Sequence, residues 1–154
     1  MQREIKFRGK RVDTGEWIYG LFGNCKIENL IVPCIEIYKE WDSEDYIDYI
    51  EIDGETLGQF TGLKDKNDVE IYEGDIVTGS NYPFKDLDRN HIENDTPNYN
   101  GTVAWCEETL GYYIELYSVN DTKRGISNGM PKDFDEVENI EVIGNIYEEV
   151  QSEI

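Results

Sequence analysis

Two apolar runs separated by a polar turn, between Thr56 and Thr78, constrain the fold more than any other stretch of the chain. The apolar positions are rich in β-branched residues and are expected to be buried: Phe60, Leu63, Val69, Ile71, Ile76 and Val77. The segment Lys64–Asp68 between them contains Asn and Asp, which tolerate positive φ, and predicts a hairpin with a loop of roughly four residues. A tighter turn is predicted at Glu73-Gly74-Asp75, because glycine adopts backbone conformations forbidden to its neighbours. We interpret Asp65, Asp68 and Asp75 as turn residues rather than cation ligands.

The N-terminal third also reads as short strands. Residues 3–12 alternate between apolar and basic positions, and Asp13-Thr14-Gly15 supplies a turn to an antiparallel partner around Trp17. The basic face of this first strand could contact phosphate or an acidic peptide, or it could be solvated or pair with the chain's own carboxylates. A third strand is predicted at 30–38, with an open edge or bulge at Pro33, followed by a loop at 39–45 and a strand at 46–52.

The remaining chain predicts further strands around one long loop. Thr102–Cys106 and Tyr112–Tyr117 are expected to form a hairpin in which Gly111 has positive φ. A short helix is expected at 132–137, and a last strand at 142–147 with a bulge at Gly144-Asn145. Residues 79–101, which include the single histidine His91, predict a mobile loop, because a loop this long within a compact domain is unusual.

Three blocks of the sequence resemble the YopX-like family of bacteriophage and prophage proteins. The central block is Gly-Leu-Lys-Asp-Lys-Asn followed, after three residues, by Ile-Tyr-Glu-Gly-Asp-Ile-Val, and it spans residues 62–77. The other two blocks are the N-terminal motif at 3–9 with its continuation at 15–20, and the closing motif at 140–148. The chain departs from the family pattern at Asp68, where the family usually carries glycine.

This resemblance implies a mostly β fold, with an SH3-like barrel in the second part of the chain, and a phage origin without an established activity. Combined with the predicted strands, it gives a mainly β protein with few short helices. We expect an antiparallel β region at residues 1–55. The SH3-like small β-barrel is expected at residues 56–154, with the mobile loop at 79–101.

The net charge of −20 is distributed unevenly. Residues 36–78 carry fourteen acidic and three basic side chains, whereas residues 1–35 carry six basic and four acidic ones. Such a field repels nucleic acid and membrane surfaces and favours basic partners. No apolar run approaches the roughly twenty residues of a membrane span, and the charged N-terminus lacks a secretory signal. We therefore expect a cytoplasmic protein, in the bacterial host, that binds neither membranes nor nucleic acid directly.

No catalytic, cofactor-binding or metal-binding residues emerge from the sequence. A single histidine offers no Ser/His/Asp or Cys/His arrangement and no metal-ligand spacing, and no glycine-rich phosphate loop follows a strand. Carboxylates are too abundant for any pair to indicate a hydrolase. We expect a protein that is not an enzyme.

Two classes remain: the charge serves solubility alone, or the chain binds a partner, in one of three ways. The chain could be a small acidic interaction protein that binds a host or phage protein, a mimic of DNA that inhibits a host DNA-binding protein or nuclease, or a structural module that self-associates. The candidate partner-binding residues are the acidic and aromatic positions Glu44, Asp45, Asp48, Tyr49, Glu51, Asp53 and Tyr112.

Overall fold

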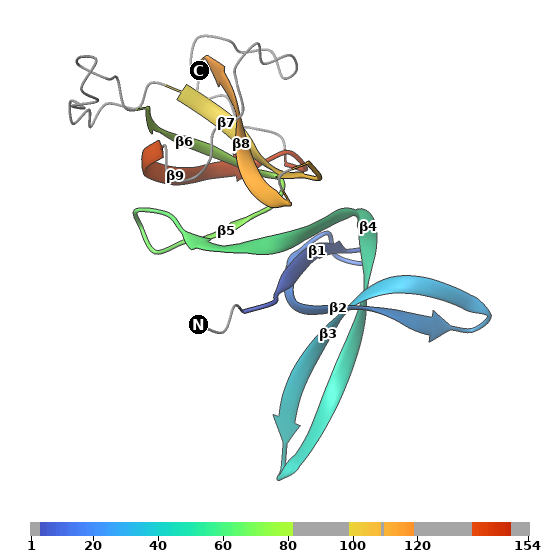
Figure 1. The fold of residues 1–154 in the computed structure, drawn as a ribbon. Coiled ribbons are helices and arrows are strands. Elements are labelled where there is room, and N and C mark those ends of the chain that lie inside the picture. Colours follow the sequence, from blue (N-terminus) through green and yellow to red (C-terminus); the bar gives the residue numbers. More distant parts are fainter. Residues whose placement is uncertain (1–3, 82–98, 109, 119–136, 149–154) are drawn as a thin grey trace, which may run out of the picture. The chain divides into compact units, whose positions relative to one another are not determined.

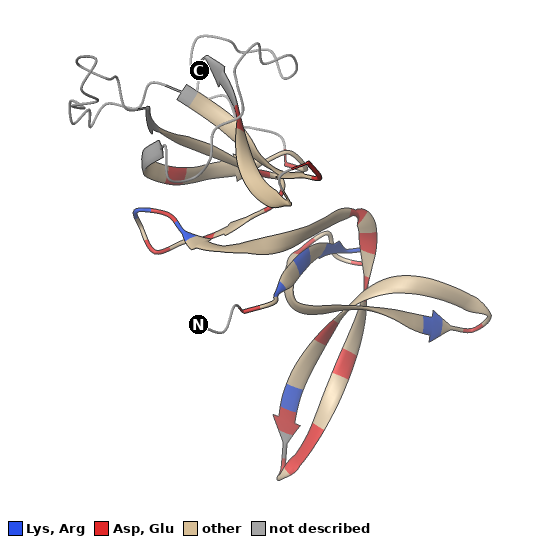
Figure 2. Cartoon of the chain, viewed as in Figure 1, with Lys and Arg blue, Asp and Glu red and all other residues tan. Residues whose placement is uncertain are grey.

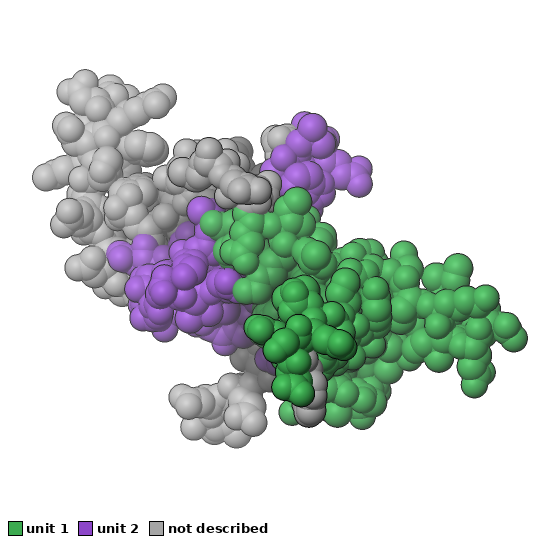
Figure 3. Space-filling view, turned by 90° about the horizontal axis from the view of Figure 1, so that it is seen from below, with its two compact units in different colours: residues 1–62 green, residues 63–154 purple. Residues whose placement is uncertain are grey.

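The computed structural model describes residues 4–81, 99–108, 110–118 and 137–148, and these residues form strands and turns with no helix among them (Figure 1). The predicted mainly β architecture is confirmed. The chain divides into two compact units, Met1–Gly62 and Leu63–Ile154, which Figure 3 colours separately. The predicted division, after residue 55, lies within strand β4 (Glu44–Lys64).

Unit 1 contains a sheet that closes on itself. Its strands are β1 (Phe7–Arg11), β2 (Trp17–Ile27), β3 (Leu30–Trp41) and most of β4. Every neighbouring pair is antiparallel, and β1 pairs with both β2 and β4. The sheet closes because β2 and β4 each change their pairing partner along their length. Residues 17–20 of β2 pair with β1 and residues 21–27 with β3, while residues 44–51 of β4 pair with β3 and residues 52–59 with β1.

The two long hairpins of unit 1 extend beyond this closed region in different directions (Figure 1). We define the β2–β3 arm as residues 21–34, which turn at Glu28-Asn29, and the β3–β4 arm as residues 36–51, which turn at Asp42-Ser43. The predicted loop at 39–45 is wrong, because strand pairing continues to Trp41 and Glu44. Asp42 and Ser43 both have positive φ (48° and 73°), so two residues suffice for the reversal.

Two small residues allow the strands of unit 1 to approach. A Cβ at Gly20 would lie 2.3 Å from the Glu36 carbonyl oxygen, so only glycine lets β2 lie this close to β3 at the root of the β3–β4 arm. A bulge interrupts the pairing of β1 with β4, and the buried Thr56 hydroxyl closes it. That hydroxyl accepts a hydrogen bond from the Lys10 backbone N–H (2.8 Å) and donates one to the Asp53 carbonyl (2.6 Å).

The basic face of β1 packs on aromatic rings of β2. The Arg8 guanidinium lies 4.6 Å from the Trp17 ring centroid, the Lys10 ammonium lies 5.3 Å from the same centroid, and Lys6 lies 6.0 Å from that of Tyr19. Arg8 is only 6% exposed. Each of these cations therefore contacts an aromatic ring of the same unit. The interpretations of this face that the sequence left open stay predictions.

Unit 2 contains β5 (Glu70–Tyr72), β6 (Asp75–Asn81), β7 (Tyr99–Cys106), β8 (Gly111–Ser118) and β9 (Val137–Asn145). The last four form an antiparallel sheet in the order β8-β7-β6-β9. Its buried cluster is Ile71, Val77, Val103 and Ile114, with Tyr112, Ile140 and Val142 packed against it. An SH3-like barrel stays a prediction for this unit.

The predicted turns of unit 2 are built by aspartates. The Asp65 carboxylate accepts hydrogen bonds from the backbone N–H groups of Asn67 (2.8 Å), Val69 (3.0 Å) and Val142 (2.9 Å), which ties the turn to β9. Asp75 accepts one from the Tyr72 N–H (2.8 Å) across Gly74, whose φ is 86°. Their interpretation as turn residues is confirmed.

Several expectations for unit 2 need correction or fall outside the described residues. Leu63 and Val69 are exposed rather than buried, and Leu110, not Gly111, has the positive φ before β8. The predicted loop at 79–101 is wrong at both ends, because residues 79–81 belong to β6 and residues 99–101 to β7. The rest of that segment, including His91, lies outside the described residues. The expected helix at 132–137 also lies outside it, except for Val137 at the start of β9.

Candidate functional site

The β3–β4 arm brings together five of the seven candidate residues. Because directly opposed residues of an antiparallel pair share a face, the register assigns each side chain to one of two faces. One face carries Glu36 opposite Tyr49, Tyr38 opposite Ile47, and Glu40 opposite Asp45, with Glu51 next in line. The other face carries Ile37 opposite Asp48 and Lys39 opposite Tyr46, with Glu44 next in line on β4. Each face therefore mixes carboxylates with apolar or aromatic side chains.

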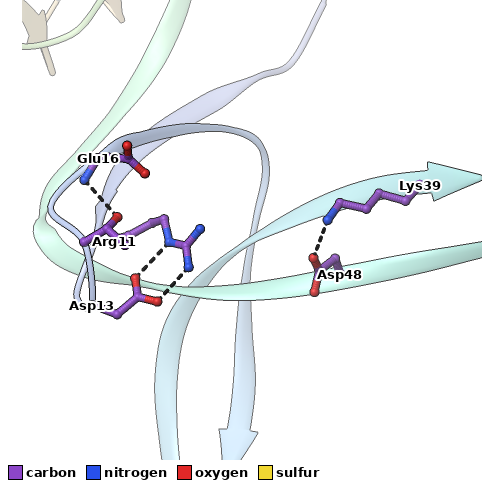
Figure 4. Close-up of polar contacts among 6 residues, drawn as sticks. Arg11, Asp13, Glu16, Lys39 and Asp48 are labelled. Carbon is purple, nitrogen blue, oxygen red and sulfur yellow. Dashed lines mark hydrogen bonds and ion pairs between the residues drawn. The ribbon is translucent and has the colours of Figure 1, made fainter.

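The arm is strongly acidic, as the red segments along both of its strands show (Figure 2). Residues 36–51 contain seven acidic side chains and one basic one, Lys39. The Lys39 ammonium donates a hydrogen bond to the Asp48 carboxylate at 2.7 Å (Figure 4), which raises the pKa of Lys39 above its ordinary value. The only cation of the arm is therefore already engaged by one of its carboxylates.

Aromatic and aliphatic side chains are exposed among these carboxylates. Tyr38 is 67% exposed, Tyr49 is 52% exposed, and Tyr46 and Ile47 are also open to solvent. A hydrogen bond to Asp45 raises the pKa of Tyr38, so these two residues also interact on their shared face. Exposed tyrosines beside carboxylates suit the recognition of a cationic protein surface, because tyrosine rings attract cations and are enriched where proteins bind each other.

Asp53 and Tyr112 do not join this arrangement. Asp53 follows the arm in the bulge of β4, where its carboxylate accepts a hydrogen bond from the Glu55 N–H (3.0 Å) and its carbonyl accepts the one from Thr56. Tyr112 belongs to unit 2 and packs against the buried cluster, with its ring edge-on to Trp105 at a centroid distance of 5.0 Å. Both residues make local contacts, and their role in partner binding stays a prediction.

The predicted binding residues did not include Tyr38, Tyr46 or Ile47. The available signal was the alternation of Glu36, Tyr38 and Glu40 on one strand. That signal identifies a face only when the register is known, and the register depends on the two-residue turn at Asp42-Ser43. A loop predicted at 39–45 hid the pairing that makes these side chains neighbours.

Other polar groups of the described residues serve local structure. Arg11 donates two hydrogen bonds to Asp13, at 2.8 and 2.6 Å, within the first turn of unit 1 (Figure 4). Among the described residues, no three His, Cys, Asp or Glu side chains gather in a way that could hold a metal ion. The part of the chain that the structure describes also contains no helix of the length and apolarity that a membrane span requires.

A family model described as "YopX protein" matches residues 6–151, which is nearly the whole chain. No curated protein matches the chain.

Proposed function

This chain belongs to the YopX protein family, and we propose that it is a small phage-encoded accessory protein that binds a host or phage protein through its β3–β4 arm. The observation that carries this proposal is that exposed tyrosines lie among the seven acidic side chains of the arm. The one lysine of the arm, Lys39, is paired with Asp48. A surface of this kind complements a basic protein surface, and its rings supply contact area at the centre of an interface. We assign it no catalytic role or cofactor and place it in the host cytoplasm.

The register favours a protein partner over the mimicry of DNA. A mimic needs carboxylates at phosphate-like spacing along one surface, whereas the arm divides its acids between two faces and separates them with Tyr38, Ile47 and Tyr49. The test described next therefore includes outcomes that would support DNA mimicry or self-association instead.

The test is capture from host lysate on the immobilised full-length chain, at low and at high salt. The arm variant carries Glu44→Gln, Asp45→Asn, Asp48→Asn and Glu51→Gln. A matched control loses four carboxylates elsewhere through Glu16→Gln, Glu107→Gln, Glu108→Gln and Glu115→Gln, all of which are exposed. We expect the wild-type chain and the control to recover the same partner, and the arm variant to lose it.

Each outcome separates one interpretation from the others. Recovery of a partner that does not bind DNA, lost only with the arm variant, supports the proposal. A DNA-binding partner released as salt rises supports mimicry, since salt screens charge-driven association. Equal recovery by all three proteins contradicts a role for the arm, and recovery of nothing favours a self-assembling module.

A further inference from the structure

An apolar groove of about 330 Å³ lies at the root of the β3–β4 arm, within unit 1. Its apolar lining comes from the segment before β1 and from β2, β3 and β4, and comprises Ile5, Tyr19, Leu21, Ile37, Tyr38 and Ile47. All of these side chains except Ile37 are among the exposed large hydrophobic residues. A concave site walled by exposed apolar side chains is the usual form of a binding pocket.

The groove lies where the pairing of β2 with β3 ends, at Leu21 opposite Glu36. Gly20 forms part of its lining, and its missing Cβ permits β2 to pass beside the Glu36 carbonyl. Because Leu21 lies opposite Glu36 and Tyr38 lies two residues beyond Glu36 on the same face, both side chains line the same groove. The groove therefore depends on the close approach of β2 to β3 at Gly20. Most of the apolar side chains that line it are exposed to solvent and can contact a bound group.

The charge around the groove is negative. Glu4 and Glu36 contribute to the lining together with one cation, Lys6, which lies 6.0 Å from the Tyr19 ring centroid. The β3–β4 arm begins at Glu36 and adds six further carboxylates against the paired Lys39. An occupant is therefore favoured if it combines an apolar side chain for the groove with positive charge along the arm.

We propose that this groove receives one aliphatic side chain from a lysine- or arginine-rich segment of the partner protein, whose basic side chains lie along the β3–β4 arm. This inference rests on the proposed function and adds the chemistry of the bound segment. The arm supplies the charge attraction, and the groove selects among basic segments by the presence of the aliphatic side chain. Burial of a leucine-sized group in the groove is expected to tighten binding roughly 10- to 100-fold.

The test uses two fluorescent peptides and the full-length chain at low salt. Both peptides consist of lysines around one central residue, which is leucine in the first and serine in the second. Two groove variants, Leu21→Ser and Ile47→Ser, are compared with Ile31→Ser, a matched control on the β2–β3 arm at a residue that is 76% exposed. Both groove positions are about half exposed, so neither substitution removes a buried contact of the fold.

We expect the leucine peptide to bind the wild-type chain and the Ile31→Ser control more tightly than the serine peptide does, by the stated factor. Each groove variant should reduce the leucine peptide to the affinity of the serine peptide and leave the latter unchanged. Equal affinity of the two peptides for the wild-type chain, or an unchanged difference in both groove variants, overturns the inference.

The same measurements separate this inference from the proposed function. If both peptides bind equally and the arm variant releases both, the arm binds basic segments and only the groove inference fails. If neither peptide binds, or if the arm variant binds them like the wild-type chain, the proposed function fails as well. Sedimentation of the chain alone adds one more contradicting outcome, a dimer that Ile47→Ser abolishes, because a second copy then occupies the groove.

Discussion

Asp65 is the side chain on which the central turn of the sequence depends. It is only 8% exposed, and its carboxylate accepts three backbone hydrogen bonds, one of them from β9. Burial pushes the pKa of Asp65 upward, but the hydrogen bonds from Val142, Val69 and Asn67 outweigh it and hold the pKa below the ordinary 3.8. The charged form is therefore stabilised by folding.

Substitution of Asp65 by asparagine should lower the free energy of unfolding by about 1–3 kcal/mol at pH 7, because one acceptor oxygen becomes a donor facing backbone N–H groups. A group whose pKa is depressed by folding stabilises the fold above its unfolded-state pKa and loses this effect as pH falls through the folded-state pKa. Urea unfolding from pH 7 to pH 2 should show the difference between wild type and variant shrinking below about pH 4. A difference that stays constant with pH would refute this role, and the exposed Asp68→Asn serves as control.

Asp68 occupies a turn position whose backbone conformation favours glycine. Its φ is 67°, the left-handed conformation that glycine adopts without strain, and its carboxylate lies 3.2 Å from the Lys64 ammonium. A side chain with a Cβ costs about 1 kcal/mol or more in this conformation. The free energy of unfolding of Asp68→Gly, measured in urea, should therefore exceed that of Asp68→Ala by about 1 kcal/mol. Equal values for the two variants would show that the turn relaxes.

At the scale of elements, the bulge between β1 and β4 depends on the Thr56 hydroxyl. Thr56→Val keeps the shape of the side chain but removes both hydrogen bonds, to the Lys10 N–H and the Asp53 carbonyl. The loss of a buried acceptor should destabilise the chain by about 1–3 kcal/mol. Thr56→Ser retains the hydroxyl and should recover most of that stability in urea unfolding. If valine proves as stable as threonine, the bulge is held by packing alone.

Strands and turns were largely predictable because their signals are local. The alternation at 3–12 predicted β1, although the strand is confined to Phe7–Arg11 and leaves Ile5 outside it. The strand around Trp17 is β2, and Asp13-Thr14-Gly15 forms the turn between the two, where Gly15 has a φ of 72°. Pro33 was expected at an open edge, and β3 is indeed paired there only with β2.

The partner change along β2 and β4 was not predictable, because alternation marks a strand without saying which neighbour it pairs with. The dense charge at 39–45 suggested a loop, whereas exposed arm strands accommodate charge on both faces. Leu110 took the positive φ expected of Gly111, so residue preference alone did not locate that turn. The groove is lined by four separate segments of unit 1. A local sequence pattern does not indicate which distant segments come together.

At the scale of the whole molecule, the chain buries apolar residues within two compact units, and a long acidic hairpin of unit 1 is exposed. Net charge of this size keeps a small protein soluble and speeds its encounter with basic partners. Charge alone does not define a site, however, because carboxylates also cover other exposed positions. The distinguishing feature of the β3–β4 arm is that its carboxylates surround exposed rings and begin beside an apolar groove.

The most direct test of this account is a backbone amide chemical-shift titration of the isotopically labelled full-length chain with the leucine-centred lysine peptide. Shift changes should concentrate in residues 36–51 and around Leu21, with the amides of β5 to β9 unchanged. Salt should reduce the changes along the arm more than those at the groove, since the arm contributes charge and the groove contributes apolar contact. Changes centred on the carboxylates of unit 2, or spread evenly over all acidic positions, would contradict the assignment of the β3–β4 arm as the binding surface.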